Sequence, residues 1–412
     1  MFRYIAPSGT KITILDILAW FFDIILFKDR SSTLRNSIIN KYQTRHCFLM
    51  ASGRAAMAML FRMLKDLNKD PSRCEIIVPS YTCYSVPAAV EIAGLKLRVC
   101  DIDRNTLSYD MNQLKAIDFS KVIAIVSSSL YGIPNDLPAI RRLADENGIV
   151  FIDDAAQAMN SSVDDQYSGS YGHIGLYSLD KGKNITSIQG GIIVTNDDNY
   201  AAEIERRIDK LQYPSASYRL KEAIQLLAYT VLLRPWLYWI PARAPFLGLG
   251  KTLYTTDYYY SRYSRHLASI ATRLFKRIES ITQSRKRNFN TLARKLADFP
   301  GLSLPTIPSN IDHCALRFPV FVQDPIMRSE MIAALHEIGI GATASYPDSI
   351  NRLDEVSHFI ASSAPCPGGE YVADHVMTLP TMEYLSELDV ENIHTQLQMC
   401  VKQKSLEGSG TE

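Results

Sequence analysis

The sequence predicts an α/β protein with a mostly parallel sheet flanked by helices, followed by a smaller C-terminal α+β unit. Short buried-strand segments alternate with helical segments between residues 75 and 197, which is the pattern of a parallel sheet with helical crossovers. The chain has 412 residues, 47% of them apolar and 21% charged, with a net charge of +1. This composition excludes wholesale disorder and provides no bulk basic field for nucleic-acid binding.

Local patterns justify the individual elements. Residues 52–67 begin with a turn and continue as a helix, because apolar residues recur at i, i+3, i+4 and i+7 from Leu60. The expected strands are 75–80, 95–103, 122–129, 149–155, 175–179, 190–197, 315–322 and 340–346; the other expected helices are 12–27, 85–94, 137–148, 270–298, 328–339 and 387–400. Ligands of parallel sheets bind at the carboxyl ends of the strands, so we expect the site there.

Four regions follow from this arrangement. Residues 1–34 form an N-terminal amphipathic segment, and residues 35–270 form the large domain, with an apolar insertion at 218–250. Residues 271–405 supply a linking helix and the small domain. The polar tail at 406–412 is expected to fray.

The cysteines indicate a reducing compartment. There are seven, an odd number, and the closest pair, Cys74 and Cys83, is separated by nine positions. This spacing excludes a CxxC zinc or redox motif, and we expect no metal site. No cleavage site follows the apolar residues 12–27, so no signal peptide is recognised and a cytoplasmic location is expected.

Two segments are unusually apolar. In 12–27, Asp16 and Asp23 are seven residues apart and share one face, which predicts an amphipathic helix rather than a membrane span. The run 223–247 is cut by Pro235. Both segments together hold Trp20, Trp236 and Trp239, with arginines and lysines flanking the second. Aromatic rings with flanking cations suit peripheral contact with a bilayer interface, but packing as core remains an equal alternative.

The residues most specific for chemistry lie in FIDDAAQAMN (151–160) and GLYSLDKGKNITSIQGG (175–191). A strand ends in carboxylates, and a serine and a lysine follow five positions apart. Pyridoxal phosphate requires such a set: a lysine for its aldehyde, a carboxylate for its ring nitrogen, and small donors with a helix start for its phosphate.

These segments, with SGRAAM (52–57) and IIVPSYTCYSV (76–86), resemble the DegT-like (DegT/StrS) nucleotide-sugar aminotransferases of pyridoxal-phosphate fold type I. The resemblance covers residues 48–200 well and 275–395 more weakly. It implies the fold-type-I architecture, a large domain and a smaller C-terminal α+β domain, with pyridoxal 5'-phosphate as cofactor.

The resemblance assigns the phosphate end of the cofactor to Gly53, Arg54, Ala55 and Ser178. Arg54 stands where the family has threonine. The family's stacking aromatic ring is replaced by a cysteine after Thr82, so either Tyr84 takes its place or the stacking is lost.

The resemblance assigns the reacting end to three residues. Asp154 aligns with the partner of the pyridine nitrogen, and Gln157 aligns with the residue beside the phenolic oxygen. Lys183 aligns with the lysine bonded to the cofactor; the five-residue interval from Ser178 favours it over Lys181. A helix cap is the alternative role for Asp154 and its neighbour Asp153.

The implied activity is transfer of an amino group from an amino acid to a keto sugar, nucleotide- or lipid-linked, for surface polysaccharide. A homodimer is implied as well. The family's partner-subunit motif is not recognisable near 210–222, and Ile188-Gln189 replaces the Gly-Glu after the lysine. These departures motivate the alternative of a non-catalytic binding or regulatory protein with the same fold.

Overall fold

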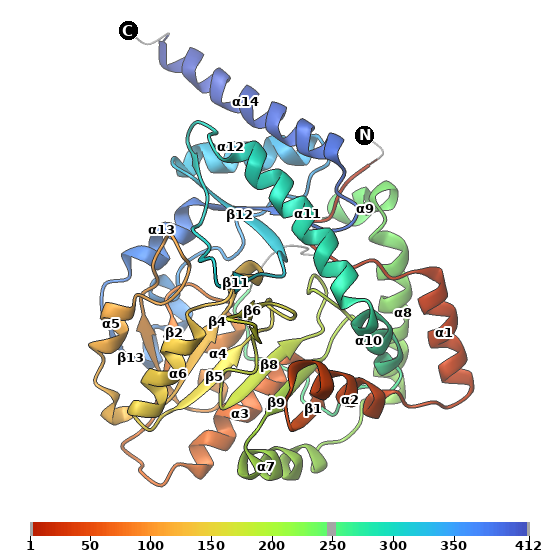
Figure 1. Cartoon of the computed structure of the whole chain (residues 1–412), viewed down its shortest axis with the longest axis vertical. Helices are drawn as coiled ribbons and strands as arrows, with labels where there is room; N and C mark the ends of the chain where they lie inside the picture. Colours follow the sequence, from red (N-terminus) through yellow and green to blue (C-terminus); the bar gives the residue numbers. More distant parts are fainter. Residues whose placement is uncertain (1–2, 245–252, 410–412) are drawn as a thin grey trace.

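The computed structural model describes residues 3–244 and 253–409, which form one large sheet and two small ones (Figure 1). The strands are β1 (His46–Met50), β2 (Glu75–Pro79), β3 (Lys96–Cys100), β4 (Val122–Ser128), β5 (Val150–Asp154), β6 (Ser162–Val163), β7 (Gln166–Tyr167), β8 (Ile174–Ser178), β9 (Gly191–Thr195), β10 (Leu302–Ser303), β11 (Ile311–Asp312), β12 (Arg317–Val322), β13 (Ile360–Ser363) and β14 (Val376–Pro380). The α-helices are α1 (Ile14–Ile25), α2 (Ser31–Tyr42), α3 (Gly53–Leu67), α4 (Ser85–Ile92), α5 (Met111–Lys115), α6 (Leu137–Glu146), α7 (Asp198–Asp209), α8 (Ala216–Leu232), α9 (Pro235–Ala242), α10 (Leu267–Lys276), α11 (Ile278–Leu296), α12 (Pro325–Glu337), α13 (Pro367–His375) and α14 (Glu387–Ser409).

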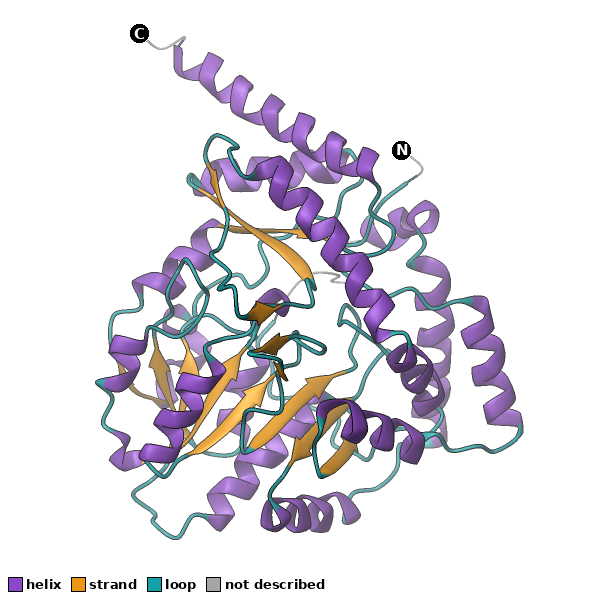
Figure 2. Cartoon of the chain, in the orientation of Figure 1, coloured by secondary structure: helices purple, strands orange, loops and turns teal. Residues whose placement is uncertain are grey.

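The large sheet has eight strands in the order β1-β9-β8-β5-β4-β2-β3-β13. The pairs from β8 to β13 along this order are parallel, whereas β9 runs antiparallel to both of its neighbours. The predicted fold class, a mostly parallel sheet between helices, is confirmed (Figure 2).

Side-chain alternation along the strands explains why both faces of this sheet are covered. Ile76 and Val78 of β2 pack into a core with α3 and α4. Ile77, between them, packs on the opposite face with Leu137 and Ile140 of α6. Strands buried on both faces read as continuous apolar runs, which is why the sequence marks them clearly.

The C-terminal part of the chain builds a small antiparallel sheet, β10-β12-β14, covered by α11, α12 and α14 (Figure 1). It also returns to the large sheet, because β13 pairs in parallel with β3 at the sheet edge. The predicted small α+β unit therefore exists, but the C-terminal segment is shared between both sheets.

Three predicted elements differ from the structure. Residues 340–346 are not a strand; single bridges join Ile340 to Ile5 and Thr343 to Thr378, and Ser345 has a φ of 64°. The helix expected at 270–298 is interrupted at Arg277, which separates α10 from α11. Helix α14 continues to Ser409, beyond the predicted start of a frayed tail.

The two apolar segments are helical. The N-terminal one forms α1, as predicted, and the insertion forms α8 and α9, separated at Pro235; residues 245–252 of the insertion lie outside the described residues. None of the described helices is both long and apolar enough to cross a bilayer.

Candidate active site

A cavity of about 280 Å³ lies at the carboxyl ends of the large-sheet strands. Six of the predicted residues line it: Gly53, Arg54, Asp154, Gln157, Ser178 and Lys183. They come from α3, from the end of β5 and the turn after it, and from β8 and the loop after it. Folding therefore gathers residues of three separate sequence motifs around one space.

The start of α3 forms one end of the cavity. Ser52 caps the helix, and its Oγ accepts the Ala55 amide at 3.1 Å. The amides of Gly53 and Arg54 belong to the first turn, which has no carbonyl partners within the helix. A helix start of this kind binds anions, and the Ser178 hydroxyl lies on the same wall.

Glycine is required where β9 meets this helix start. A Cβ on Gly191 would lie 2.4 Å from the Ser52 carbonyl oxygen. Any side chain there would push β9 away from α3. The pair Gly190-Gly191 therefore allows a close contact at the anion-binding end.

Two neighbouring carboxylates at the end of β5 face opposite sides of the sheet. Asp154 lines the cavity, where its Oδ1 accepts the Ala156 amide at 3.0 Å. Burial raises the pKa of Asp154 to about 6, opposed by that amide and by the charge of Lys183. Asp153 points away and accepts the Gly169 amide at 2.6 Å, so it holds a turn behind the sheet.

Lys183 lies in the loop between β8 and β9, which the N-terminal segment holds in place. The Thr10 hydroxyl reaches the carbonyl oxygens of Lys183 and Asn184, at 2.9 Å each, and the Ser8 hydroxyl donates to the Gly182 carbonyl at 2.7 Å. Lys181, the other lysine of this loop, is exposed and does not line the cavity.

A buried arginine supports this anchor from behind. The Arg285 guanidinium donates to the Gly9 carbonyl at 2.7 Å and to the Thr10 hydroxyl at 3.1 Å. Sequence reasoning missed Thr10 and Arg285, because they lie 173 and 102 positions from Lys183 and nothing local marks them.

Gln157 is fixed at both ends of its amide. The Tyr131 backbone amide donates to its Oε1 at 3.1 Å, and its Nε2 donates to the Tyr346 hydroxyl at 2.8 Å. Tyr131 has a φ of 57°, an uncommon conformation for a residue with a side chain. Both tyrosines were missed from the sequence.

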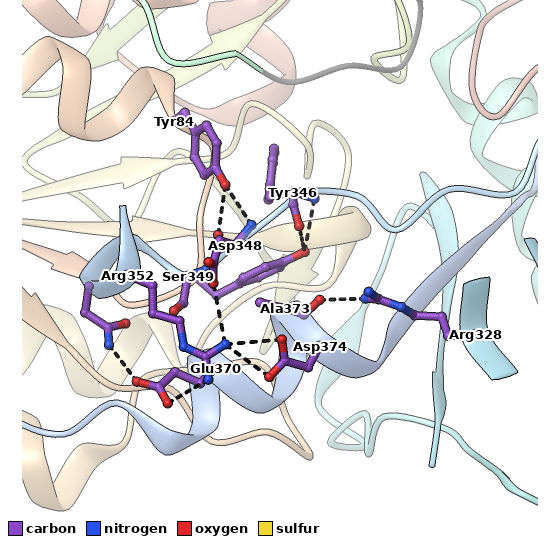
Figure 3. Close-up of polar contacts among 11 residues, drawn as sticks. Tyr84, Arg328, Tyr346, Asp348, Ser349, Arg352, Glu370, Ala373 and Asp374 are labelled. Carbon is purple, nitrogen blue, oxygen red and sulfur yellow. Dashed lines mark hydrogen bonds and ion pairs between the residues drawn. The ribbon is translucent and has the colours of Figure 1, made fainter. Parts of the chain in front are cut away.

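Ala55 and Tyr84 do not line the cavity. The amide of Ala55 is taken by Ser52, whereas Tyr84 is bonded to the C-terminal segment: its hydroxyl accepts the Asp348 amide at 2.7 Å (Figure 3). Thr82 and Cys83 occupy the wall at this place instead.

A hydrogen bond on one side and ion pairs on the other fix the segment that carries Tyr346. Tyr81 accepts the Tyr346 amide at 3.1 Å. Farther along, Arg352 forms ion pairs with Glu370 at 2.9 Å and with Asp374 at 3.1 Å (Figure 3). These contacts hold Tyr346, which belongs to the C-terminal segment, at the site on the large sheet.

Part of the cavity wall is aromatic and comes from the insertion and the segment after it. Tyr218, in the first turn of α8, stacks on Tyr259 with ring centroids 3.9 Å apart. The Tyr218 hydroxyl donates to Gln189 at 3.1 Å, and Gln189 in turn bonds Glu222. Gln189 and Tyr218 both line the cavity, so α8 forms part of the site.

These residues fit pyridoxal phosphate. The cavity offers a helix start and a serine for the phosphate, Asp154 for the ring nitrogen and Lys183 for the aldehyde. Ser129 Oγ, on the same wall, is buried without a partner among the described residues. The space between Gly53 and Ser178 is open. A Cβ added to Gly53 would lie 3.4 Å from the Cβ of Ser178.

Comparisons with known proteins identify the family. The family model described as the DegT/DnrJ/EryC1/StrS aminotransferase family matches residues 28–398. The UDP-N-acetyl-3-dehydro-alpha-D-glucosamine 3-aminotransferase of Acidithiobacillus ferrooxidans is 27% identical over 346 residues, which cover 84% of this chain and 81% of that protein. A pleiotropic regulatory protein of Geobacillus stearothermophilus is 27% identical over 317 residues, 76% of this chain and 74% of that protein.

A solved structure shares the fold. Helicobacter pylori PseC, an aminotransferase involved in the biosynthesis of pseudaminic acid, superposes with a TM-score of 0.79 at 16% identity and covers 97% of this chain and 100% of its own. These similarities to aminotransferases do not favour the alternative of a non-catalytic protein. The chain belongs to the DegT/DnrJ/EryC1/StrS aminotransferase family and is a pyridoxal-phosphate-dependent aminotransferase.

Proposed function

We propose that this enzyme transfers an amino group from an amino acid to the keto group of an activated sugar, for surface polysaccharide. The observation that carries the proposal is the convergence of Asp154, Ser178 and Lys183 with the start of α3 on one cavity. The relative named as a 3-dehydro-glucosamine aminotransferase supports a keto sugar as the acceptor.

The residues divide the work as follows. Gly53, Arg54 and Ser178 would hold the phosphate of the cofactor, and Asp154, when ionised, would hold its ring nitrogen. When bound, the cofactor supplies the electron sink for the reaction. Lys183 Nζ takes the proton from the Cα of the amino donor and delivers a proton to the former keto carbon of the acceptor.

The aromatic wall is the proposed acceptor side. Tyr218, Tyr258 and Tyr259 line the cavity, and the rings of Tyr218 and Tyr259 are stacked on each other. Arg54 lies over the Tyr258 ring at 6.0 Å, which joins this wall to the phosphate end.

We also propose a cytoplasmic homodimer. All seven cysteines are unpaired, as a reducing compartment favours. The dimer rests on the family resemblance, and sedimentation equilibrium of the purified enzyme tests it. A monomer with full activity would refute it.

The experiment supplies the enzyme, loaded with pyridoxal phosphate, with glutamate and a panel of keto-sugar nucleotides that includes UDP-linked 3-keto-N-acetylglucosamine. Mass spectrometry then follows the amino sugar and 2-oxoglutarate. We expect both products in equal amounts. Formation of 2-oxoglutarate without any amino sugar across the panel would overturn the proposed acceptor class.

A further inference from the structure

Three helices on one side of the molecule expose hydrocarbon rather than polar groups. On α1 and the turn after it, Leu15 is 74% exposed and Phe27 is 96% exposed, and Phe22 is exposed as well. On α8, Leu220 and Ile224 are exposed one turn apart. We call the exposed apolar side chains of α1, α8 and α9 the apolar face; most of the large apolar side chains exposed in the described residues belong to it.

The same helices turn their acids inward. Asp16 and Asp23 of α1 are buried against α10 and its flanks, where Arg277 donates to Asp16 at 2.6 Å and the Ser269 hydroxyl donates to Asp23 at 2.7 Å. Glu222 of α8 is buried and accepts the Ser264 hydroxyl at 2.6 Å. A helix that meets only water shows the opposite arrangement, with polar groups outside.

The three helices lie next to one another on one side of the molecule (Figure 1). A groove between the end of α1 and the start of α8 is lined by Phe27 and Leu220. A second groove, between the start of α1 and the start of α9, is lined by Leu15 and Trp236. Helices α1 and α8 thus lie side by side in opposite directions, and α9 extends the surface.

The charges around the apolar face identify what covers it. Lys11 and Lys28 flank α1, Lys221 lies in the second turn of α8 and Arg243 follows α9; all four are exposed. Every acid within α1, α8 and α9 is buried. The exposed acid that lines the first groove, Asp29, is already paired with Arg265 at 3.4 Å. A second copy seated on this face would therefore bring the same cations against themselves.

We propose that the apolar face docks the enzyme on the surface of an anionic phospholipid bilayer. Apolar and aromatic side chains enter the boundary between headgroups and acyl chains, and the flanking lysines and arginines bind the lipid phosphates. With 12 residues in α1 and 17 in α8, the helices lie in the plane of the membrane and do not cross it. The docking is independent of the identity of the amino acceptor.

The structure corrects one part of the sequence interpretation. Trp20 does not belong to the membrane contact, because it is buried and packs beside His266 with ring centroids 6.2 Å apart. Trp236 is exposed, and the Arg243 guanidinium lies over the Trp239 ring at 5.8 Å. An aromatic ring beside a cation is what the headgroup region favours.

Flotation in a density gradient tests the proposal. The full-length enzyme loaded with pyridoxal phosphate is mixed with phosphatidylcholine vesicles or with vesicles that also contain phosphatidylglycerol. We expect flotation with the mixed vesicles and weaker flotation with phosphatidylcholine alone. The combined variant Leu15→Ser, Phe22→Ser and Phe27→Ser should lower the partition coefficient by at least about 100-fold, since each change removes a large apolar group.

A matched control distinguishes binding through the apolar face from non-specific hydrophobic adsorption to vesicles. The variant Ile326→Ser, Leu388→Ser and Met399→Ser removes three exposed apolar side chains from the small domain and should float like the wild type. Lys28→Glu with Arg243→Glu should remove the preference for phosphatidylglycerol. Aminotransferase activity without vesicles should persist in all variants, so failure of docking is distinguishable from failure of the proposed function.

Three results would overturn the proposal. One is wild-type protein that stays at the bottom with both vesicle types. Another is equal flotation of the apolar-face variant and the matched control. The third is a face variant that changes from dimer to monomer while the wild type does not float, which would assign the face to a second copy of the chain.

Discussion

The catalytic cavity and the inner side of α1 both bury carboxylates but compensate them differently. Asp23 accepts hydrogen bonds from Arg30 and Ser269, and the bond from Arg30 holds the pKa of Asp23 below its usual range despite burial. Asp154 has a backbone amide and the nearby Lys183, and burial raises its pKa to about 6. A buried acid that is paired within the protein stabilises the fold. A buried acid that is incompletely paired and lies beside a cavity can instead pair with a positively charged group of a ligand.

The largest expected effect concerns the lysine in the cavity. Lys183→Ala should reduce amino transfer by at least about 10³-fold, because the proton carrier is lost. Borohydride treatment followed by peptide mass spectrometry should find no cofactor adduct in this variant. Lys181→Ala, whose side chain is exposed, should keep both the adduct and the activity; an adduct that persists in Lys183→Ala would contradict the assignment.

The next effect distinguishes the two acids of β5. Asp154→Asn should lower activity by about 100-fold, because the ring nitrogen loses its charged partner. Asp153→Asn should leave cofactor binding nearly intact, because Asp153 points away from the cavity and holds the Gly169 turn. Cofactor titration by absorbance measures the difference between the two variants, and equal losses of cofactor affinity would contradict this division.

Asp154 and Asp23 predict opposite pH dependence of stability. The folded-state pKa of Asp154, about 6, lies above its ordinary value of 3.8, so its ionisation opposes folding as the pH rises between these values. Cofactor-free Asp154→Asn should therefore gain up to roughly 3 kcal/mol over the wild type at pH 7, and nothing near pH 3.

Asp23→Asn should show the reverse. The pKa of Asp23 is lowered, so its stabilisation is present above the ordinary value and is lost as the pH falls through the folded-state pKa. We expect a loss of about 2 kcal/mol at pH 7 that disappears in acid. Urea unfolding at several pH values measures the free energy of unfolding of both variants. Equal slopes of this free energy against pH would contradict the prediction.

The smallest effect concerns the hydrogen bond to Gln157. Tyr346→Phe removes the acceptor of the Gln157 amide and should cost about 1 kcal/mol, or roughly fivefold in kcat/KM. Steady-state kinetics with the amino donor tests this. An unchanged kcat/KM would mean that the Tyr131 amide alone positions Gln157.

Sequence reasoning worked where local patterns carry the information. The apolar runs of β2, β4 and β5 predicted the parallel sheet, because strands buried on both faces must be apolar throughout. The end of β5 and the serine-to-lysine interval predicted that Asp154 and Lys183 meet. Both features lie within short segments whose geometry the chain dictates locally.

Sequence reasoning failed where contacts with residues far along the chain determine the local structure. Residues 340–346 look like a strand, but single bridges to Ile5 and Thr378 replace a ladder. Tyr84 has the right type for a stacking ring, yet the Asp348 backbone bonds its hydroxyl away from the cavity. Nothing local in Ile360–Ser363 announces the edge strand of the large sheet, which exists because β3 offers it a partner.

The contacts of the N-terminal segment also set an order of events during synthesis on the ribosome. Ile5 donates to the Gly339 carbonyl at 2.8 Å and accepts the Gly341 amide at 2.9 Å, so residues made among the first bind residues made near the end. Ser8 and Thr10, which hold the lysine loop, follow directly on that segment. The catalytic loop therefore receives its final support only after most of the chain has emerged, and a nascent chain truncated before Gly339 carries all of its cavity residues without that anchor.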